Sequence, residues 1–149
     1  MARQDTKLES EGAEFIALGL LLTEGIRCFK AYTNFAGYDL VAMNLATSKV
    51  ARIQVKSRWA TDYDRSFPIR NFNCDLVVLA ALNRGIRFRR RKDQVDHGRK
   101  DPEFFCFPID VVRTAQNKGD KWGKVPINKI RDLPSYRNAW HLIAKFLCD

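Results

Sequence analysis

Apolar residues are concentrated between residues 10 and 24, and their spacing predicts a helix that is buried on more than one side. Ser10 is suited to cap the start of this helix, and Gly25 is suited to end it. Glu11 and Glu14 stand three positions apart, so both are expected to project from one face near the first turns. We expect Glu11 to cap the helix or to face solvent.

Three short segments of strand-like composition follow, at residues 26–32, 39–45 and 49–57. Residues 46–48 join the second and third segments as a plausible hairpin turn. Successive residues of a strand point to opposite faces, so the third segment has one apolar face that can pack on the helix. Its other face is expected to carry Val50, Arg52, Gln54 and Lys56.

The second half of the chain contains two further apolar segments. Residues 76–82 predict a central buried strand, and residues 104–109 predict another strand. A helix is expected to start at Asp110, whose carboxylate could cap it, and a last helix is expected over residues 133–147. Loops are expected at residues 59–73 and 117–126. This order predicts a single α/β domain over residues 1–149, with helices flanking a strand-rich centre.

The net charge of the chain indicates the kind of partner that the protein binds. Lys and Arg number 26 against 17 Asp and Glu, which gives a formal net charge of +9. A basic excess of this size favours a polyanionic partner, because phosphate contacts release counterions. Much of the excess lies in a basic insertion at residues 84–100, where only Asp93 and Asp96 are acidic.

An extended hairpin arm would let alternate cations of the basic insertion follow a phosphate backbone, whereas a solvated loop is the alternative. The residues expected to contact nucleic acid are Arg87, Arg89, Arg90, Arg91 and Lys92. Aromatic residues in the loop after the third strand could stack on bases or simply pack, namely Trp59, Tyr63 and Phe67. Core or interface packing is expected of Trp122, Tyr136 and Trp140.

Cysteine and histidine spacing excludes a structural zinc site, because such a site needs closely spaced ligand pairs. The four cysteines stand at positions 28, 74, 106 and 148, and the two histidines at 97 and 141. The N-terminal residues lack the charged-then-apolar order of a signal peptide, and the longest uncharged apolar stretch, at residues 15–23, is too short to cross a bilayer. We therefore expect a soluble cytoplasmic protein with reduced thiols.

Candidate chemistry is concentrated where the two predicted hairpin strands meet. Asp39 opens one strand, and Gln54, Val55 and Lys56 lie on the next. Across an antiparallel hairpin the beginning of the first strand lies opposite the end of the second, so Asp39 is expected close to Gln54 and Lys56. Mg²⁺ prefers oxygen ligands, and a neighbouring lysine can activate water and offset charge on a phosphate. We expect Asp39 to be the main ligand, with the Gln54 side-chain oxygen and the Val55 carbonyl as further ligands, and Lys56 to act on the water.

The motif Phe35-Ala36-Gly37-Tyr38-Asp39, followed after fourteen residues by Gln54-Val55-Lys56, resembles that of the PD-(D/E)XK nucleases. Tyr38-Asp39 stands where the superfamily has Pro-Asp, and Gln54-x-Lys56 where it has Glu-x-Lys. Glu14, followed by an apolar run and Gly25, is similar to the first helix of archaeal-type Holliday junction resolvases. Residues 75–79 resemble the fourth strand of the family, and residues 104–109 the strand that leads into its closing helix.

This resemblance implies a restriction-endonuclease-like α/β core with the order αβββαβ, in which helices flank a central mixed sheet of four to five strands. The basic insertion and a C-terminal helical segment at about 110–149 would be additions to that core. The resemblance also implies a DNA endonuclease of the homing, restriction or junction-resolving type that uses Mg²⁺, with Mn²⁺ as a substitute. A homodimer or higher homo-oligomer is expected.

The resemblance implies a site made of Asp39, Gln54, Lys56 and Glu14, with Glu14 supporting the metal. Arg58 continues the strand of Lys56, so we expect it near the scissile phosphate. Glutamine in place of glutamate removes one negative charge from the metal site. Some intron-encoded homing endonucleases, which the chain also resembles, have Gln-x-Lys. A catalytically silent nucleic-acid-binding module of the same fold is therefore the alternative, and a nuclease acting on RNA is a third possibility.

Overall fold

The computed structural model describes residues 6–32, 37–61, 65–87, 92–93 and 95–149. Arg89, Arg90 and Arg91 lie outside the described residues, as does Tyr63. The first half of the chain forms α1 (Lys7–Thr23), β1 (Cys28–Lys30), β2 (Leu40–Met43), β3 (Val50–Arg58) and β4 (Ser66–Pro68). The second half forms β5 (Leu76–Ala81), β6 (Glu103–Pro108), α2 (Ile109–Ala115), β7 (Lys124–Pro126), the 3₁₀ helices η1 (Ile127–Lys129) and η2 (Leu133–Tyr136), and α3 (His141–Cys148).

The first helix ends where the sequence predicts but begins earlier. Gly25 has a φ of 78°, and the N–H groups of Gly25 and Ile26 donate to the carbonyls of Leu22 and Leu21 at 3.0 Å each. This is the Schellman arrangement, for which glycine is favoured because it has no Cβ. The start of α1 at Lys7 makes the Ser10 cap wrong, since Thr6 occupies the N-cap position without a side-chain cap bond.

Burial of α1 is confined to a narrow stripe, so the prediction that several sides are buried is wrong. Ala13, Ala17 and Leu21 are buried against the sheet, four residues apart along one face. Phe15 and Leu22 are exposed. The two alanines of the stripe let this part of the helix lie close to the sheet, and Leu18 and Leu20 pack at its margins.

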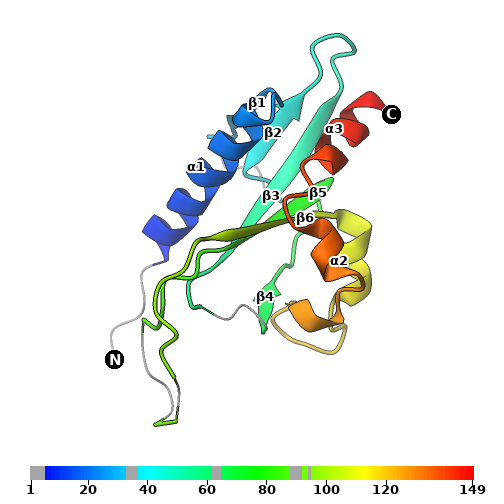
Figure 1. Ribbon diagram of the computed structural model, residues 1–149. Helices are drawn as coiled ribbons and strands as arrows, with labels where there is room; N and C mark the ends of the chain where they lie inside the picture. Colours follow the sequence, from blue (N-terminus) through cyan, green and yellow to red (C-terminus); the bar gives the residue numbers. More distant parts are fainter. Residues whose placement is uncertain (1–5, 33–36, 62–64, 88–91, 94) are drawn as a thin grey trace.

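The main sheet has five strands in the order β1-β2-β3-β5-β6, and helices flank it (Figure 1). β3 and β5 are parallel, and the other neighbours are antiparallel. This mixed α/β sheet confirms the predicted fold class, and β5 is the predicted central strand, with all six residues buried. The order of elements differs from the predicted αβββαβ. Where that order has a helix after the third strand, the described part of the β3–β5 connection contains the strand β4, and α2 comes only after β6.

Two apolar clusters cover the two faces of the sheet. One cluster joins α1 and α3 to residues such as Ile53 and Val78, and the other joins α2, β4 and β7 to Val77 and Leu79. The parallel register pairs Gln54 with Val77 and Lys56 with Leu79. Neighbouring residues in a register share a face, so the polar face of β3 points away from α1, as the alternation predicts.

Three local predictions are wrong, and tertiary contacts account for the last two. Pro108, not Asp110, occupies the N-cap of α2, and no side-chain cap bond forms. The predicted final helix is interrupted between η2 and α3, where Arg137 bridges to β6 and the Asn138 N–H donates to the Phe104 carbonyl at 2.9 Å. Both predicted loops contain a strand, because β4 and β7 pair with each other.

The basic insertion has an antiparallel base, consistent with a hairpin arm. Arg84 and Arg99 form an isolated antiparallel bridge, and the Lys100 N–H donates to the Asn83 carbonyl at 2.9 Å. From this base the chain extends beyond the sheet (Figure 1). Within the residues that the structure describes, no helix combines the length and apolarity needed to cross a membrane.

Candidate active site

Asp39 lies beside the strand that carries the Gln54-Val55-Lys56 segment. The β2–β3 register pairs Leu40 with Ile53, so one further step places Asp39 opposite Gln54. The Asp39 N–H donates to the Ile53 carbonyl at 2.8 Å, and Asp39 Oδ2 accepts the N–H of Val55 at 2.8 Å. Both ends of the residue are thus tied to β3, and the carboxylate is held at the centre of the predicted motif.

Lys56 is half-buried on the same strand, two residues beyond Gln54. Burial lowers the pKa of Lys56 below its ordinary value, because removing the ammonium from water disfavours its charged form, while the negative charge of Asp39 opposes this shift. A lysine with a lowered pKa gives up its proton more readily than a solvated one. The side chain can therefore serve either as a proton acceptor or as a local positive charge.

Glu14 reaches the same electrostatic neighbourhood from α1. Burial raises the pKa of Glu14, and the negative charge of Asp39 raises it further, whereas the hydrogen bond from Lys30 lowers it. The negative charge of Asp39 therefore acts on both Glu14, from α1, and Lys56, on β3.

Lys30 on β1 is a member of this region that the sequence did not indicate. Its Nζ lies 3.2 Å from Glu14 Oε2 and also pairs with Glu11, with only 6% of the Lys30 side chain exposed. The ammonium lies 4.2 Å from the centre of the Phe15 ring. Burial acts to lower the pKa of Lys30, but the hydrogen bonds to Glu11 and Glu14 outweigh it and raise that pKa. Glu11 is thus an ion-pair partner of Lys30 and neither a cap nor a purely solvent-facing residue.

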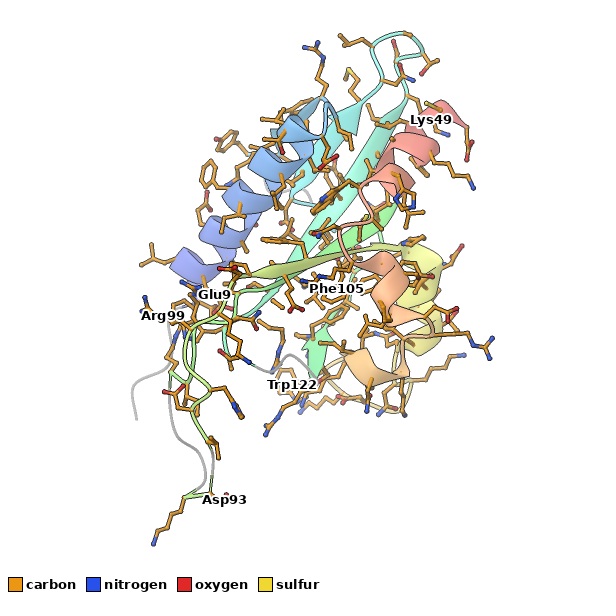
Figure 2. All side chains as sticks on the ribbon, viewed as in Figure 1. Glu9, Lys49, Asp93, Arg99, Phe105 and Trp122 are labelled. Carbon is orange, nitrogen blue, oxygen red and sulfur yellow. The ribbon has the colours of Figure 1, made fainter. Side chains whose placement is uncertain are left out.

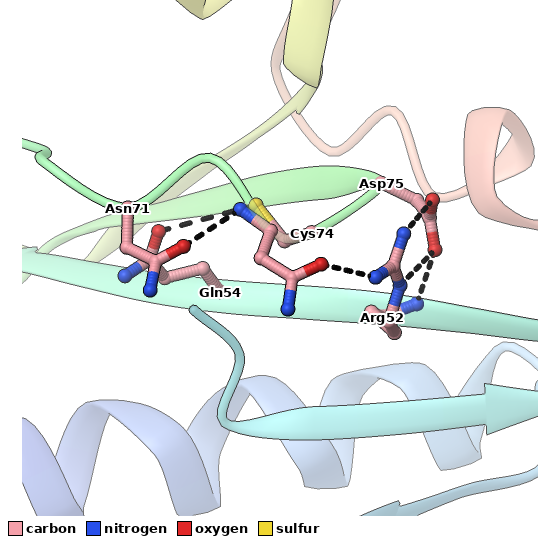
Figure 3. Close-up of polar contacts among 6 residues, drawn as sticks. Arg52, Gln54, Asn71, Cys74 and Asp75 are labelled. Carbon is pink, nitrogen blue, oxygen red and sulfur yellow. Dashed lines mark hydrogen bonds and ion pairs between the residues drawn. The ribbon is translucent and has the colours of Figure 1, made fainter. Parts of the chain in front are cut away.

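Gln54 faces the loop that precedes β5 (Figure 3). Its Oε1 lies 3.9 Å from the Sγ of Cys74, a long contact from a weak donor. Burial, followed by the charge of Asp75, raises the pKa of Cys74 to about 11, so the thiol keeps its proton at neutral pH. The amide oxygen is therefore not occupied by a strong hydrogen bond from this thiol.

A polar network fixes the same loop to β3 (Figure 3). The guanidinium of Arg52 pairs with Asp75 at 3.1 Å, and it also donates to the side chain of Asn73. The backbone of Asn73 donates to Asn71 Oδ1 at 2.9 Å. Gly37, with a φ of 100°, has no room for a side chain, since a Cβ would lie 2.8 Å from Asn71 Oδ1 and 2.9 Å from the Asn73 carbonyl. The loop therefore also packs against the chain just before Asp39.

Two of the residues predicted to contact phosphate outside this centre, Arg58 and Arg87, have other partners in the structure. Arg58 donates to the Ser66 carbonyl at 2.6 Å and so ties β3 to β4. Arg87 lies 3.6 Å from Glu9 and 3.7 Å from the centre of the Trp59 ring, which anchors the base of the basic insertion. Lys92 is exposed. The contacts of Arg58 and Arg87 are structural, and their interaction with nucleic acid stays a prediction.

The donors near Asp39 fit a hard cation in type. Asp39, Glu14 and the Gln54 amide offer side-chain oxygens, and the Val55 carbonyl offers a backbone oxygen. Among the described residues, no group of three or more His, Cys, Asp or Glu side chains is placed to hold a metal ion. Two carboxylates and neutral oxygens can bind Mg²⁺, but more weakly than three carboxylates would.

Comparison with known proteins adds evidence on the fold. No protein-family model matches the chain, and no curated protein matches its sequence. A solved structure described as a bacterial homing endonuclease, I-Ssp6803I, matches with a TM-score of 0.58 and 23% sequence identity. The match covers 95% of this chain and 94% of that chain. The two chains therefore share a fold over nearly their whole lengths.

Proposed function

We propose that this chain is a metal-dependent endonuclease of the PD-(D/E)XK superfamily that hydrolyses phosphodiester bonds of DNA, and that residues 1–149 form one nuclease domain. The observation that carries the proposal is the hydrogen bond from Val55 to Asp39, which joins the two halves of the motif. The net charge of +9 and the fold shared with a bacterial homing endonuclease support DNA as the substrate.

In this proposal each residue has a separate task. Asp39 and Glu14 hold the cation, and the oxygen atoms of Gln54 and Val55 complete its ligands. Lys56 orients the attacking water and accepts its proton, for which a lowered pKa is favourable, or offsets the charge that develops on the phosphate. When bound, Mg²⁺ or Mn²⁺ supplies a positive charge that polarises the phosphate. Lys30 keeps the carboxylate of Glu14 in place.

Cutting of supercoiled and branched DNA in the presence of Mg²⁺ or Mn²⁺ tests the proposal. The parent protein is expected to cut, and Asp39→Ala and Lys56→Ala variants are expected to lose cutting while they still bind DNA. A matched control is Asp110→Ala, because Asp110 is an exposed carboxylate on α2, outside the proposed site. Undiminished cutting by either site variant would show that the proposed centre is not the active site.

A catalytically silent nucleic-acid-binding module is the second candidate function. The neutral Gln54 and the ion pair that Lys30 makes with Glu14 both reduce the negative charge available to a cation. Tight DNA binding by the parent without cutting at any divalent metal concentration would favour this module. Cutting of RNA and not of DNA in the same assay would instead redirect the proposal to an RNA nuclease.

We also propose that the protein acts as a homodimer or higher homo-oligomer. The outer side of α1 exposes large apolar residues that a second copy could cover. These residues are Phe15, Ile16 and Leu22. Light scattering should give a mass of at least two chains, and Phe15→Glu combined with Leu22→Glu should shift it toward one chain.

A further inference from the structure

The β4–β7 sheet is an antiparallel ribbon that is longer than its two short strands. The register pairs Phe67 with Val125, and backbone hydrogen bonds extend it at both ends. The Ile69 N–H donates to the Gly123 carbonyl at 3.1 Å, and the Ile127 N–H donates to the Arg65 carbonyl at 2.8 Å. The ribbon therefore comprises residues 65–70 and 122–127.

The two faces of this ribbon have different chemistry. Phe67, Ile69 and Val125 are buried in the core that packs against α2. Residues one position away along each strand point outward. One further step of the register beyond Ile69 and Gly123 places Arg70 opposite Trp122, and the Arg70 guanidinium lies 5.1 Å from the centre of the Trp122 ring. Trp122 is 55% exposed, so the expectation of a core aromatic is wrong, whereas an interface role is untested.

Two cations lie close to this exposed ring, and a third lies on the same strand. Arg70 lies over it, Lys121 Nζ lies 5.8 Å from its centre, and Lys124 follows two positions along the strand. None of the three forms an ion pair with an acidic side chain in the part of the chain that the structure describes. Asp120 is the neighbouring acid, and its Oδ1 accepts the N–H of Trp122 at 2.7 Å. The outer face is therefore cationic, with one apolar ring at its Arg70–Trp122 end.

The ribbon holds these groups in a fixed arrangement. The Gln116 amide donates to the carbonyls of Ile69 and Gly123 at 2.8 and 3.0 Å, which closes the end near Trp122. A Cβ on Gly123 would lie 2.5 Å from the Ile69 carbonyl oxygen, so only glycine permits this approach. At the other end, Arg58 on β3 donates to the Ser66 carbonyl. The ribbon is thus attached to the strand of the proposed site.

We infer that the outer face of the β4–β7 ribbon is a second contact surface for duplex DNA, separate from the basic insertion; this inference rests on the proposed function. An antiparallel two-stranded ribbon fits the major groove of B-form DNA. Arg70 and Lys124 contact phosphates, and Trp122 positions the planar guanidinium of Arg70 by stacking. Figure 2 shows Trp122 at the same lower end of the molecule as Asp93 of the basic insertion.

Fluorescence anisotropy of a labelled DNA duplex, measured without divalent metal over a series of salt concentrations, tests this inference. Arg70→Gln and Lys124→Gln should each lower the slope of log affinity against log salt by about one. Trp122→Ala should weaken DNA binding, and Trp122→Phe should restore part of the affinity. The double variant Trp122→Ala with Arg70→Gln should lose less binding free energy than the two single variants lose in sum, because the two side chains act together. Lys145→Gln on α3 is the matched control: it removes an equal charge and should leave the affinity for DNA and its salt slope unchanged.

Salt slopes equal to that of the Lys145→Gln control would overturn the inference, as would an effect on binding to polyglutamate and not to DNA. Circular dichroism melting should match the parent, because Arg70, Trp122 and Lys124 are exposed. The two proposals fail separately. A parent that binds DNA through the ribbon without cutting leaves this inference standing, whereas a parent that cuts DNA with unchanged slopes in the variants leaves only the proposed function.

Discussion

Asp39 Oδ2 accepts a hydrogen bond of 2.8 Å from the backbone N–H of Val55, which lies between the two side chains of the Gln-x-Lys segment. This bond orients one carboxylate oxygen toward the strand and leaves the other available for a ligand. It also means that Asp39 has both a structural and a proposed chemical role. Substitutions at this position must separate the two.

Asp39→Asn separates them, because asparagine keeps an acceptor oxygen for the Val55 N–H but carries no charge. We expect Asp39→Asn to lose at least about 100-fold in cutting rate, with a free energy of unfolding within about 1 kcal/mol of the parent. Asp39→Ala should lose the same activity, and its free energy of unfolding should fall by a further 1–3 kcal/mol or so, since the Val55 N–H then lacks the Asp39 acceptor. Urea unfolding and a plasmid-cutting assay measure the two effects. Full activity in Asp39→Asn would contradict the ligand role.

Gln54 sets the charge of the proposed metal site. Gln54→Glu should keep or raise the affinity for Mg²⁺, because a carboxylate replaces a neutral oxygen, and Gln54→Ala should lower it. Calorimetric titration with Mg²⁺ in the absence of DNA measures this directly. Cys74→Ala is the matched control, since it removes the 3.9 Å contact to Gln54 without changing the site charge. Equal affinities in all four proteins would count against Gln54 as a ligand.

Lys30→Met should destabilise the fold, because it leaves Glu14, with only 17% of its side chain exposed, without its cation. We expect the free energy of unfolding to fall by about 3 kcal/mol when such a buried ion pair is broken. The pKa of Lys30 is raised in the folded state, so its stabilisation is present below its unfolded pKa and is lost as pH rises through the folded value. The difference in unfolding free energy between parent and Lys30→Met should therefore shrink above about pH 10.5. Lys30→Arg should recover part of the loss.

Lys56 should show the opposite dependence on pH. Its pKa is lowered in the folded state, so the charged amine costs stability at neutral pH, and stability rises as pH passes from the folded to the unfolded pKa. Lys56→Met is expected to raise the free energy of unfolding at pH 7 while it abolishes cutting. That gain should vanish above about pH 10.5, where the unfolded lysine is also neutral. A destabilised Lys56→Met protein at pH 7 would contradict this assignment.

The sequence predicts the sheet well where local patterns and tertiary contacts agree. The continuous apolar run at Leu76–Ala81 is typical of a strand covered on both faces, and β5 lies between two strands. The alternation along β3 and the turn before it predict that Asp39 lies close to Gln54 and Lys56, because the start of one hairpin strand lies opposite the end of the other. The exact partner, Gln54, follows from the observed register.

Local sequence does not determine the contacts between residues that are far apart in the chain. Lys30 is a charged residue on a three-residue strand, and only the packing of α1 on β1 buries it between Glu11 and Glu14. Trp122 resembles a core residue by type, but its register opposite Arg70 turns it outward. β4 and β7 are too short to carry a periodic signal and exist because they pair with each other. Periodicity reports which side of an element is apolar, whereas the partner that covers that side is determined by the tertiary structure.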